Sequence, residues 1–314
     1  MAKAQLKGAL ILLFTSVIWG SAFVAQSVGL ERIDAFTFSG VRTLIGAAVL
    51  FLFILIRDLS TRHRLTPEEA ALRRSGNKKA LLYGIVLGVV LCAATNFQQF
   101  AFYETTSGKI AFITALYMFF VPLIGLFFKK KISLSVWICI LIASLGLFFL
   151  CIDPGEPFSV NRGDLLALVC AFLFAIQILL VEKFAPLVDG VKLSCVEFAV
   201  SGAVSCVLMF IFERPIMSDI VASWVPILYA GVLSTGVAYT LQVVGQKYCE
   251  ATVASIMMCA ESVFALIAAM IILHEIPSVR EAVGCALMFF AIVLSQVAEP
   301  LGKKIKKRKS LDSK

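Results

Sequence analysis

Residues 251–273 read ATVASIMMCAESVFALIAAMIIL, an apolar stretch that one carboxylate, Glu261, interrupts near its middle. A helix needs about 20 apolar residues to cross a bilayer, so this stretch is long enough to span one. At about 1.5 Å per residue, Glu261 would lie roughly 15 Å from either end, at the membrane midplane. An ionisable group at this depth is costly to insert and usually faces a protein interior or a wet cavity. The stretch therefore predicts a membrane helix that carries an acid at a buried site.

The composition of the whole chain is that of a membrane protein. Of its 314 residues, 60% are hydrophobic and 15% are charged, and the mean hydropathy is +0.96. A soluble chain of this length would need more charge to cover its surface. The nine cysteines lie scattered in apolar segments without the Cys/His spacing of a metal site, and no Gly-rich phosphate loop is present. We therefore expect no cofactor, no metal and no enzymatic activity.

Ten apolar segments are each long enough to cross a membrane. They cover residues 8–28, 35–56, 80–102, 108–128, 133–152, 162–181, 191–212, 224–246, 251–273 and 278–298. We expect an all-α polytopic membrane protein of ten transmembrane helices. The one long connection, 57–79, is polar and contains TPEEAALRR, which we expect to form a surface helix. The basic tail, 301–314, is expected to be disordered.

Basic residues fix the expected orientation, because cytoplasmic loops are enriched in lysine and arginine. With the N-terminus in the cytoplasm, most of the 28 lysines and arginines fall on the cytoplasmic side, including those of 57–79, 129–131 and the tail. Both termini are then cytoplasmic. The net charge of +8 reflects this topology rather than nucleic-acid binding. The tail is expected to contact anionic lipid headgroups.

The ten segments divide into two sets of five, 1–152 and 153–300. Sliding 97–133 by 145 positions onto 242–278 matches the hydropathy profile without a gap. An odd number of spans in each set forces the second copy to enter the membrane upside down. Two inverted halves can rock against each other and open a midplane site to each side in turn, which is typical of secondary transporters. We therefore expect transport by alternating access.

Several stretches resemble one known family. They are SVIWGSAF (16–23), the arginine of FSGVRTLIGAAVL (38–50), ITALYMFFVPLIGLFFKKKIS (113–133), YAGVLSTGVAYTLQ (229–242) and AESVFALIAAMIILHEIPS (260–278). In order and spacing they are similar to the drug/metabolite transporter superfamily, EamA type. The resemblance covers about residues 8–298. It implies a ten-helix secondary carrier of metabolites, often an exporter, in the plasma membrane of a bacterium (the inner membrane).

Three charged side chains lie well inside the predicted spans, more than one helical turn from either end: Arg42, Glu197 and Glu261. Two acids and one base leave a net negative charge in a medium of low dielectric if all are ionised. We expect Glu261 to carry a proton in one state of the cycle or to bind a cationic group of the substrate. The alternative is a structural ion pair between Arg42 and Glu261 that joins the second and ninth spans. Glu261→Gln separates the two hypotheses.

Polar side chains supply the remaining candidates for substrate binding. In the eighth span, Thr235, Tyr239, Gln242 and Gln246 recur at the spacing of one helical face. Asn96 and Gln99 form a similar pair on the third span, where Gln98 is expected on another face. Trp19, on a face shared with Gln26, and Tyr117 complete the set. The alternative role of each of these side chains is to hold helices together by hydrogen bonds.

Together these features predict a transporter, most simply an exporter, of a small polar metabolite such as an amino acid or a related solute. Its partners would be the solute, protons if the cycle is proton-coupled, and the lipid bilayer, with the chain as a monomer or homodimer. The polar stripe of the eighth span favours amino acids or similar solutes. Glu261 and the aromatic content would instead suit efflux of lipophilic cations. A membrane-embedded lipid-modifying enzyme is the third hypothesis, but it would need clustered acids or a nucleophile near the interface.

Overall fold

The computed structural model describes residues 2–62, 66–105, 107–130, 132–152, 160–273 and 278–311. The first half contains α1 (Ala2–Leu30), α2 (Ala35–Arg62), α3 (Pro67–Ala101), α4 (Ser107–Ala115), α5 (Tyr117–Phe127) and α6 (Leu134–Cys151). The second half contains α7 (Arg162–Phe184), the 3₁₀ turn η1 (Ala185–Leu187), α8 (Gly190–Phe212), α9 (Met217–Ala222), α10 (Trp224–Leu228), the π-helical segment η2 (Tyr229–Tyr239), α11 (Thr240–Gln246), α12 (Ala251–Met258), α13 (Glu261–Leu273) and α14 (Val279–Leu311).

The fold is all-helical across the described residues, and several of its helices are long and apolar. Eight helical stretches of the described chain have the length and hydropathy to cross a membrane, and a shorter apolar helix covers Ala251–Ile267. The predicted class, an all-α multi-pass membrane protein, is therefore confirmed. The number of ten spans remains a prediction.

Of two expectations about the polar segments, one is confirmed and one is wrong. The predicted surface helix in 57–79 is present and exposed, and it forms the beginning of α3, which runs without interruption into the bundle. Thr66 caps this helix: its backbone N–H donates to the Glu69 carboxylate at 2.8 Å, and its hydroxyl accepts from the Glu69 N–H at 3.3 Å. At the other end of the chain α14 continues through Leu311, so residues 301–311 are helical rather than disordered.

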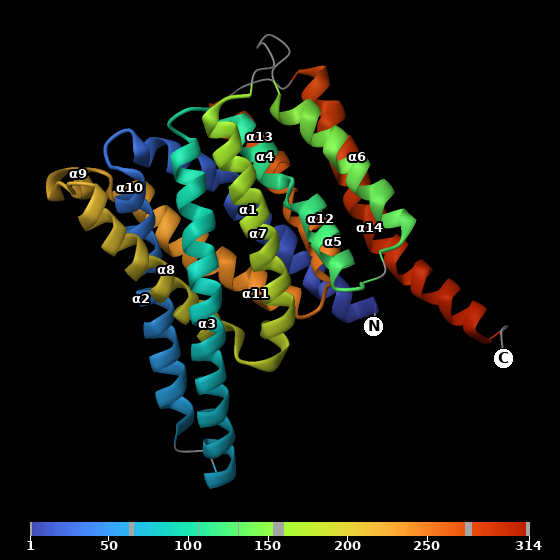
Figure 1. The fold of residues 1–314 in the computed structure, drawn as a ribbon, viewed down its shortest axis with the longest axis horizontal. Helices are drawn as coiled ribbons and strands as arrows, with labels where there is room; N and C mark the ends of the chain where they lie inside the picture. The colour runs from blue at the N-terminus through green and yellow to red at the C-terminus, as the bar shows by residue number, and fades with distance from the viewer. Residues whose placement is uncertain are drawn as a thin grey trace.

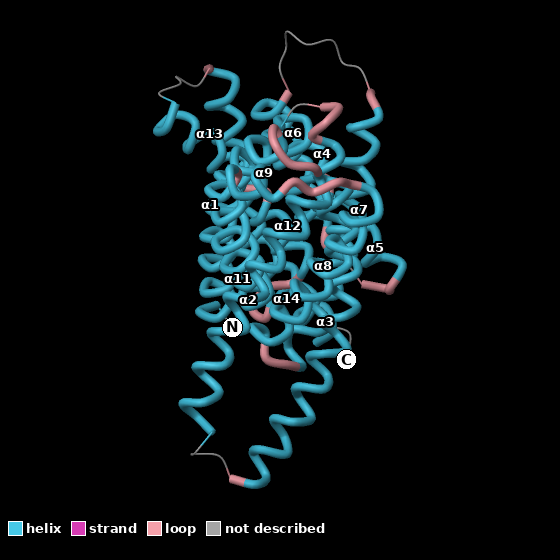
Figure 2. The backbone as a smooth tube through the Cα atoms, turned by 90° about the vertical axis from the view of Figure 1, so that its left-hand side faces the viewer, coloured by secondary structure: helices cyan, strands magenta, loops and turns pink. Residues whose placement is uncertain are grey.

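The helices pack in an uneven bundle (Figure 1). α1 contacts η2, α11, α12 and α13, while α8 packs on α2 and α3. α6 and α14 lie side by side on one flank. There a Cβ on Gly146 would approach the Gly284 carbonyl oxygen to 2.9 Å, so the two backbones touch. The end of α2 and the start of α3 extend beyond the rest of the bundle (Figure 2).

Two of the predicted spans are broken near their middles. α4 and α5 are separated at Leu116, and α12 and α13 are separated at Cys259 and Ala260. The shift of 145 positions places Leu116 on Glu261, directly after the break at Cys259 and Ala260, so the two breaks fall within two residues of each other. The predicted unbroken helix 251–273 is therefore two helices. Because of the break, Glu261 lies in the first turn of α13, where the helix dipole favours a carboxylate.

The N-terminus of α2 is held by two side chains from other parts of the chain. The carboxylate of Glu213 accepts from the N–H groups of Phe36 at 2.7 Å and Thr37 at 2.8 Å, and from the Thr37 hydroxyl at 2.7 Å. The Tyr103 hydroxyl accepts from the Ala35 N–H at 2.9 Å. Burial raises the pKa of Tyr103 to about 12, so this phenol stays neutral at physiological pH.

Removal of this carboxylate should destabilise the protein. Glu213→Ala leaves the first N–H groups of α2 without their acceptor, and loss of a helix cap costs about 0.5–2 kcal/mol. We expect a lower midpoint of thermal unfolding in detergent. Glu213→Gln, which keeps one acceptor oxygen, should fall between the wild type and the alanine variant. Equal midpoints for all three proteins would contradict the capping role.

Candidate functional site

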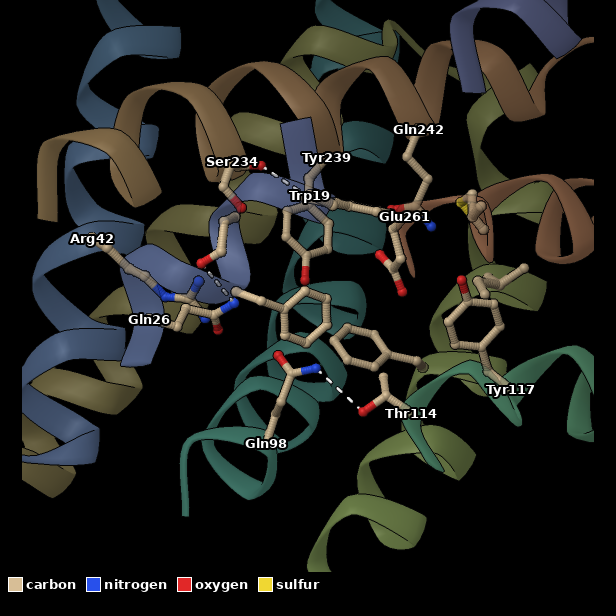
Figure 3. Close-up of a pocket in the computed structure, with 15 residues that line it drawn as sticks. Trp19, Gln26, Arg42, Gln98, Thr114, Tyr117, Ser234, Tyr239, Gln242 and Glu261 are labelled. Carbon is tan, nitrogen blue, oxygen red and sulfur yellow. Dashed lines mark hydrogen bonds between the residues drawn. The ribbon is translucent and has the colours of Figure 1, made fainter. Parts of the chain in front are cut away.

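A small cavity lies between the two halves of the chain (Figure 3). It is lined by Trp19, Ala22, Phe23, Gln26, Arg42, Gln98, Thr114, Tyr117, Phe174, Ile178, Ser234, Tyr239, Gln242, Met258 and Glu261. Its volume is about 40 Å³. Sites for small organic ligands usually enclose about 300–1,000 Å³. This cavity therefore has room for a few water molecules, and a solute can enter only after the helices or side chains around it move.

Glu261 faces this cavity from the start of α13. It is 5% exposed, and it forms no side-chain hydrogen bond or ion pair with any described residue. Figure 3 shows its carboxylate near the Tyr117 ring, whose hydroxyl also lacks a hydrogen-bond partner among the described residues. A buried carboxylate without a charged partner is unfavourable in a folded protein. The position is therefore suited to a ligand or a proton.

Arg42 faces the same cavity from α2. It is 2% exposed, and its guanidinium stacks over the Phe38 ring at 5.4 Å from the centroid. Its Nε has no hydrogen-bond partner, and no carboxylate of the described residues forms an ion pair with it. The structural ion pair with Glu261, left open by the sequence, is not formed within the described part of the chain. Figure 3 shows Arg42 and Glu261 on opposite sides of the group, with Trp19 and Tyr239 between them.

Glu197, the third predicted charge, lies outside the cavity. It is fully buried on α8, where its Oε1 accepts from Nε2 of Gln177 at 3.0 Å. Gln177 in turn accepts from Gln242 at 3.0 Å, and Gln242 lines the cavity. The structure thus connects Glu197 to the cavity through two amides.

Aromatic residues form the middle of the site. Nε1 of Trp19 donates to the Ser234 carbonyl at 3.4 Å, and the Trp19 ring meets the Tyr239 ring edge-on at 4.7 Å between centroids. Tyr239 also packs against Phe198 on α8. Among the predicted residues, Trp19, Tyr117, Tyr239 and Gln242 therefore line the cavity together with Arg42 and Glu261.

Four predicted binding residues lie in contacts between helices instead of lining the cavity. Asn96 donates to the Cys92 carbonyl and to the Ser205 hydroxyl, both at 2.8 Å. Gln99 donates to Gln26. Gln246 donates to the Ile178 carbonyl at 3.1 Å. The last residue, Thr235, lies where η2 crosses α2.

The π-helical form of η2 explains the position of Thr235. The prediction assumed α-helical spacing, which would put a residue four positions before Tyr239 on the same face. A π-helix is closed by i→i+5 hydrogen bonds, so its turns are wider. The residue five positions before Tyr239, Ser234, lines the cavity in place of Thr235. π-Helical turns are frequent at functional sites.

Gln98 lies on another face of α3 than Asn96 and Gln99, as expected, but this is the face that lines the cavity. Its amide donates to the Thr114 hydroxyl at 3.4 Å. The residues 95–99 include four polar side chains, which cover most of the circumference of α3. Periodicity could therefore not identify the side that faces the site. Gln26, predicted on the same face as Trp19, also lines the cavity.

Ion pairs join the helices around the cavity at both ends. At the predicted outer end, Lys109 at the start of α4 pairs with Asp164 on α7 at 2.9 Å. At the predicted cytoplasmic end, Lys130 pairs with Glu182, and Glu182 also accepts from the Ala251 N–H at 3.0 Å. α7 therefore carries an acid at each end that ties it to a neighbour, in keeping with a closed form.

The profile of the EamA-like transporter family matches residues 6–152 and again residues 161–296. The chain belongs to the EamA-like transporter family. The two matches divide this family member close to its middle, as the two sets of predicted spans do. Among the described residues, no group of three or more His, Cys, Asp or Glu side chains is arranged to hold a metal ion.

The sequence alignments with two relatives extend over nearly the whole chain. An uncharacterized transporter of Archaeoglobus fulgidus is 25% identical over 90% of this chain and 83% of its own. The uncharacterized transporter YoaV of Bacillus subtilis is 24% identical over 89% of this chain and 93% of its own. A crystal structure with 17% sequence identity matches with a TM-score of 0.75, covering 93% of this chain and 96% of that one. That similarity shows a shared fold.

Proposed function

We propose that this transporter moves a small zwitterionic or otherwise polar metabolite, such as an amino acid, through the cavity between its halves. One observation carries the proposal. Arg42 and Glu261, two buried side chains of opposite charge, face one cavity, and neither has a charged partner among the described residues.

Charge complementarity indicates the kind of solute. Buried charges are usually paired, because an unpaired charge in low dielectric is costly. A solute with a carboxylate and an ammonium group would pair with Arg42 at one side of the cavity and with Glu261 at the other. Gln26, Gln98 and Gln242 add neutral donors and acceptors between them. Such a solute would satisfy groups that remain unpaired in the closed form.

Alternating access follows from the proposed inverted repeat. The repeat is supported by the breaks at Leu116 and at Cys259–Ala260, which fall within two residues of each other under the shift of 145 and would leave helix ends near the expected midplane. Rocking of the halves would open the ion pairs of α7 at one end and then at the other. We infer secondary active export, with proton coupling through a buried carboxylate. The chain would lie in a bacterial plasma membrane with both termini in the cytoplasm.

Efflux of lipophilic cations is the second candidate function. It is favoured by the aromatic rings of Trp19, Tyr117, Phe174 and Tyr239 around the cavity and by the single carboxylate of Glu261. A cation of this kind would use Glu261 but would leave Arg42 unpaired. The two functions therefore differ in whether Arg42 contributes to binding.

A thermal-stability screen of the detergent-purified protein separates the two functions. The panel contains amino acids, nucleosides, polyamines, sugars and lipophilic cations. A ligand at 100 times its dissociation constant stabilises a protein by about 2.7 kcal/mol, which is measurable. We expect amino acids to raise the unfolding midpoint of the wild type and to lose this effect in both Arg42→Gln and Glu261→Gln. A shift from lipophilic cations alone, retained in Arg42→Gln, would favour the second function.

A further inference from the structure

Three hydrogen-bonded side chains lead from the cavity to an acid that does not line it. Gln242 on α11 lines the cavity, and its Nε2 donates to Oε1 of Gln177 on α7 at 3.0 Å. Nε2 of Gln177 donates in turn to Oε1 of Glu197 on α8 at 3.0 Å. Glu197 and Gln177 are fully buried, and Gln242 nearly so. The fold thus connects the wall of the cavity to a carboxylate through two amides from separate helices.

Both hydrogen bonds in this row of three side chains have their donor on the side away from Glu197, so each donor points toward the acid. An ionised carboxylate can only accept hydrogen bonds, so it orients the NH₂ group of Gln177 toward α8. Gln177 can then offer only its carbonyl oxygen to Gln242, which must present its own NH₂ group. Oε1 of Gln242 has no hydrogen-bond partner in the described part of the chain. The ionised acid therefore leaves Gln242 with an unused acceptor at the cavity.

Protonation of Glu197 reverses this preference. When the carboxylate takes up one proton from water, an O–H bond forms and the neutral acid becomes a donor. Its Oε2 has no partner among the described residues, so a proton there would lack an acceptor. The Gln177 carbonyl becomes an acceptor within reach once the amide rotates by half a turn. The rotated Gln177 then presents its NH₂ group to Gln242, so the Gln242 amide must also rotate by half a turn from its present orientation, in which Nε2 faces Gln177. After both rotations Gln177 donates to Oε1 of Gln242, and the NH₂ group of Gln242 is left as an unused donor.

We propose that Glu197, acting through Gln177, decides whether Gln242 offers the solute a hydrogen-bond acceptor or a donor. The inference rests on the proposed function and deepens it. When Glu197 is ionised, Gln242 offers an acceptor and binds the ammonium group of a solute. When Glu197 is protonated, Gln242 offers a donor, which disfavours binding of the ammonium group. Gln242 is then a specificity-determining residue, while Gln177 and Glu197 are positioning residues that couple uptake of a proton to release of the solute.

Other titratable or charged groups lie on the helices around Glu197. Within the helices they include Arg42 on α2, Tyr83 and Cys92 on α3, Cys170 on α7, Cys195 and Cys206 on α8, and Tyr229 and Tyr239 at the ends of η2. Toward the ends of these helices they include Arg57, Asp58, Glu68, Glu69, Arg73, Arg74, Lys78, Lys79, Arg162, Asp164, Glu182, Lys183, Lys192 and Lys247. None of them forms an ion pair with Glu197 among the described residues. The hydrogen bond from Gln177 is its direct polar contact in the described part of the chain. A change of its charge also acts electrostatically on Tyr239, which lines the cavity.

Infrared difference spectroscopy of the purified protein tests this inference without requiring transport. The spectrum is recorded between high and low pH, with the side-chain carbonyl of glutamine labelled with ¹³C. In the wild type we expect a carboxylic acid band to appear at low pH together with a change in the labelled glutamine bands. Glu197→Gln should lose its own component of the acid band, while the components of Glu261 and the other carboxyl groups remain, and it should lose the change in the labelled glutamine bands. The band of Gln242 is identified as the part of the glutamine signal that is missing in Gln242→Leu. Gln177→Leu should keep the acid band, but its Gln242 band should no longer change with pH.

Gln99→Leu is the matched control. Gln99 is a buried amide, but it donates to Gln26 and takes no part in the hydrogen bonds between Gln242, Gln177 and Glu197. It should keep both signals. A wild-type glutamine signal that does not change with pH, or a full response in Gln177→Leu, would overturn the inference. If the infrared signals behave as expected while no amino acid stabilises the protein, the coupling stands and the proposed solute is wrong. A loss of both signals in every variant would indicate misfolding. The unfolding midpoint of each variant tests for this. If Gln242→Leu is misfolded, Gln242→Asn replaces it.

Discussion

Glu261→Gln is expected to lower the affinity for an amine-containing solute at least about tenfold while the protein stays folded. A hydrogen bond to a charged group contributes about 1.5–3 kcal/mol, which corresponds to roughly 10- to 100-fold in affinity. Glutamine keeps the size and one acceptor of the side chain but not its charge. In the absence of solute, the substitution removes a buried carboxylate that has no charged partner among the described residues. The empty variant should therefore be as stable as the wild type or more stable.

Two measurements on the same preparation check this expectation. The unfolding midpoint without solute reports stability, and its rise with an added amino acid reports binding. Glu31→Gln, which changes an exposed acid at the end of α1, is the control and should leave both values unchanged. A strong loss of stability in Glu261→Gln without solute would instead support a structural role for the carboxylate.

Gly20→Ala is expected to destabilise the protein more than any other substitution considered. A Cβ at this position would lie 2.5 Å from the Glu261 carbonyl oxygen and 2.7 Å from the Ala265 nitrogen. Both atoms belong to the backbone of α13, so they cannot turn aside as a flexible side chain could. Overpacking of this kind costs about 1–3 kcal/mol, and at times more. The displacement would also move the first turn of α13, which carries Glu261, relative to the cavity.

Gly76→Ala is the matched control for this prediction. Gly76 lies in α3, and a Cβ there would meet no atom within 4 Å. Alanine is the better helix former by about 1 kcal/mol, so this variant should be as stable as the wild type or slightly more stable. Yield and unfolding midpoint in detergent are the readouts. Similar midpoints for the two alanine variants would show that the crossing of α1 and α13 can adjust.

The sequence predicted the fold class because the length of its apolar stretches and the distribution of its charges can be read directly from the order of the residues. It also identified most of the charged and aromatic groups at the site, since an ionisable residue inside a span usually faces a cavity or the interior of the bundle. It missed the features that depend on local geometry. The break before Glu261 and the π-helical turns at Ser234 leave no trace in a pattern that assumes regular α-helices. The sequence favoured Asn96 and Gln99 over Gln98 as the cavity-facing residues of α3, because polar residues surround that part of the helix and leave no apolar side to orient it.

The small volume of the cavity has a consequence for measured affinities. A solute that needs an open cavity binds only the fraction of molecules that are open, and its apparent dissociation constant is the intrinsic value divided by that fraction. If about one molecule in a hundred is open, affinity is weakened about 100-fold, which corresponds to roughly 2.7 kcal/mol. Substitutions that loosen the ion pairs of α7 should then tighten apparent binding without touching the solute. A weak apparent affinity would therefore reflect the small fraction of open molecules as well as the intrinsic affinity of the open site for its solute.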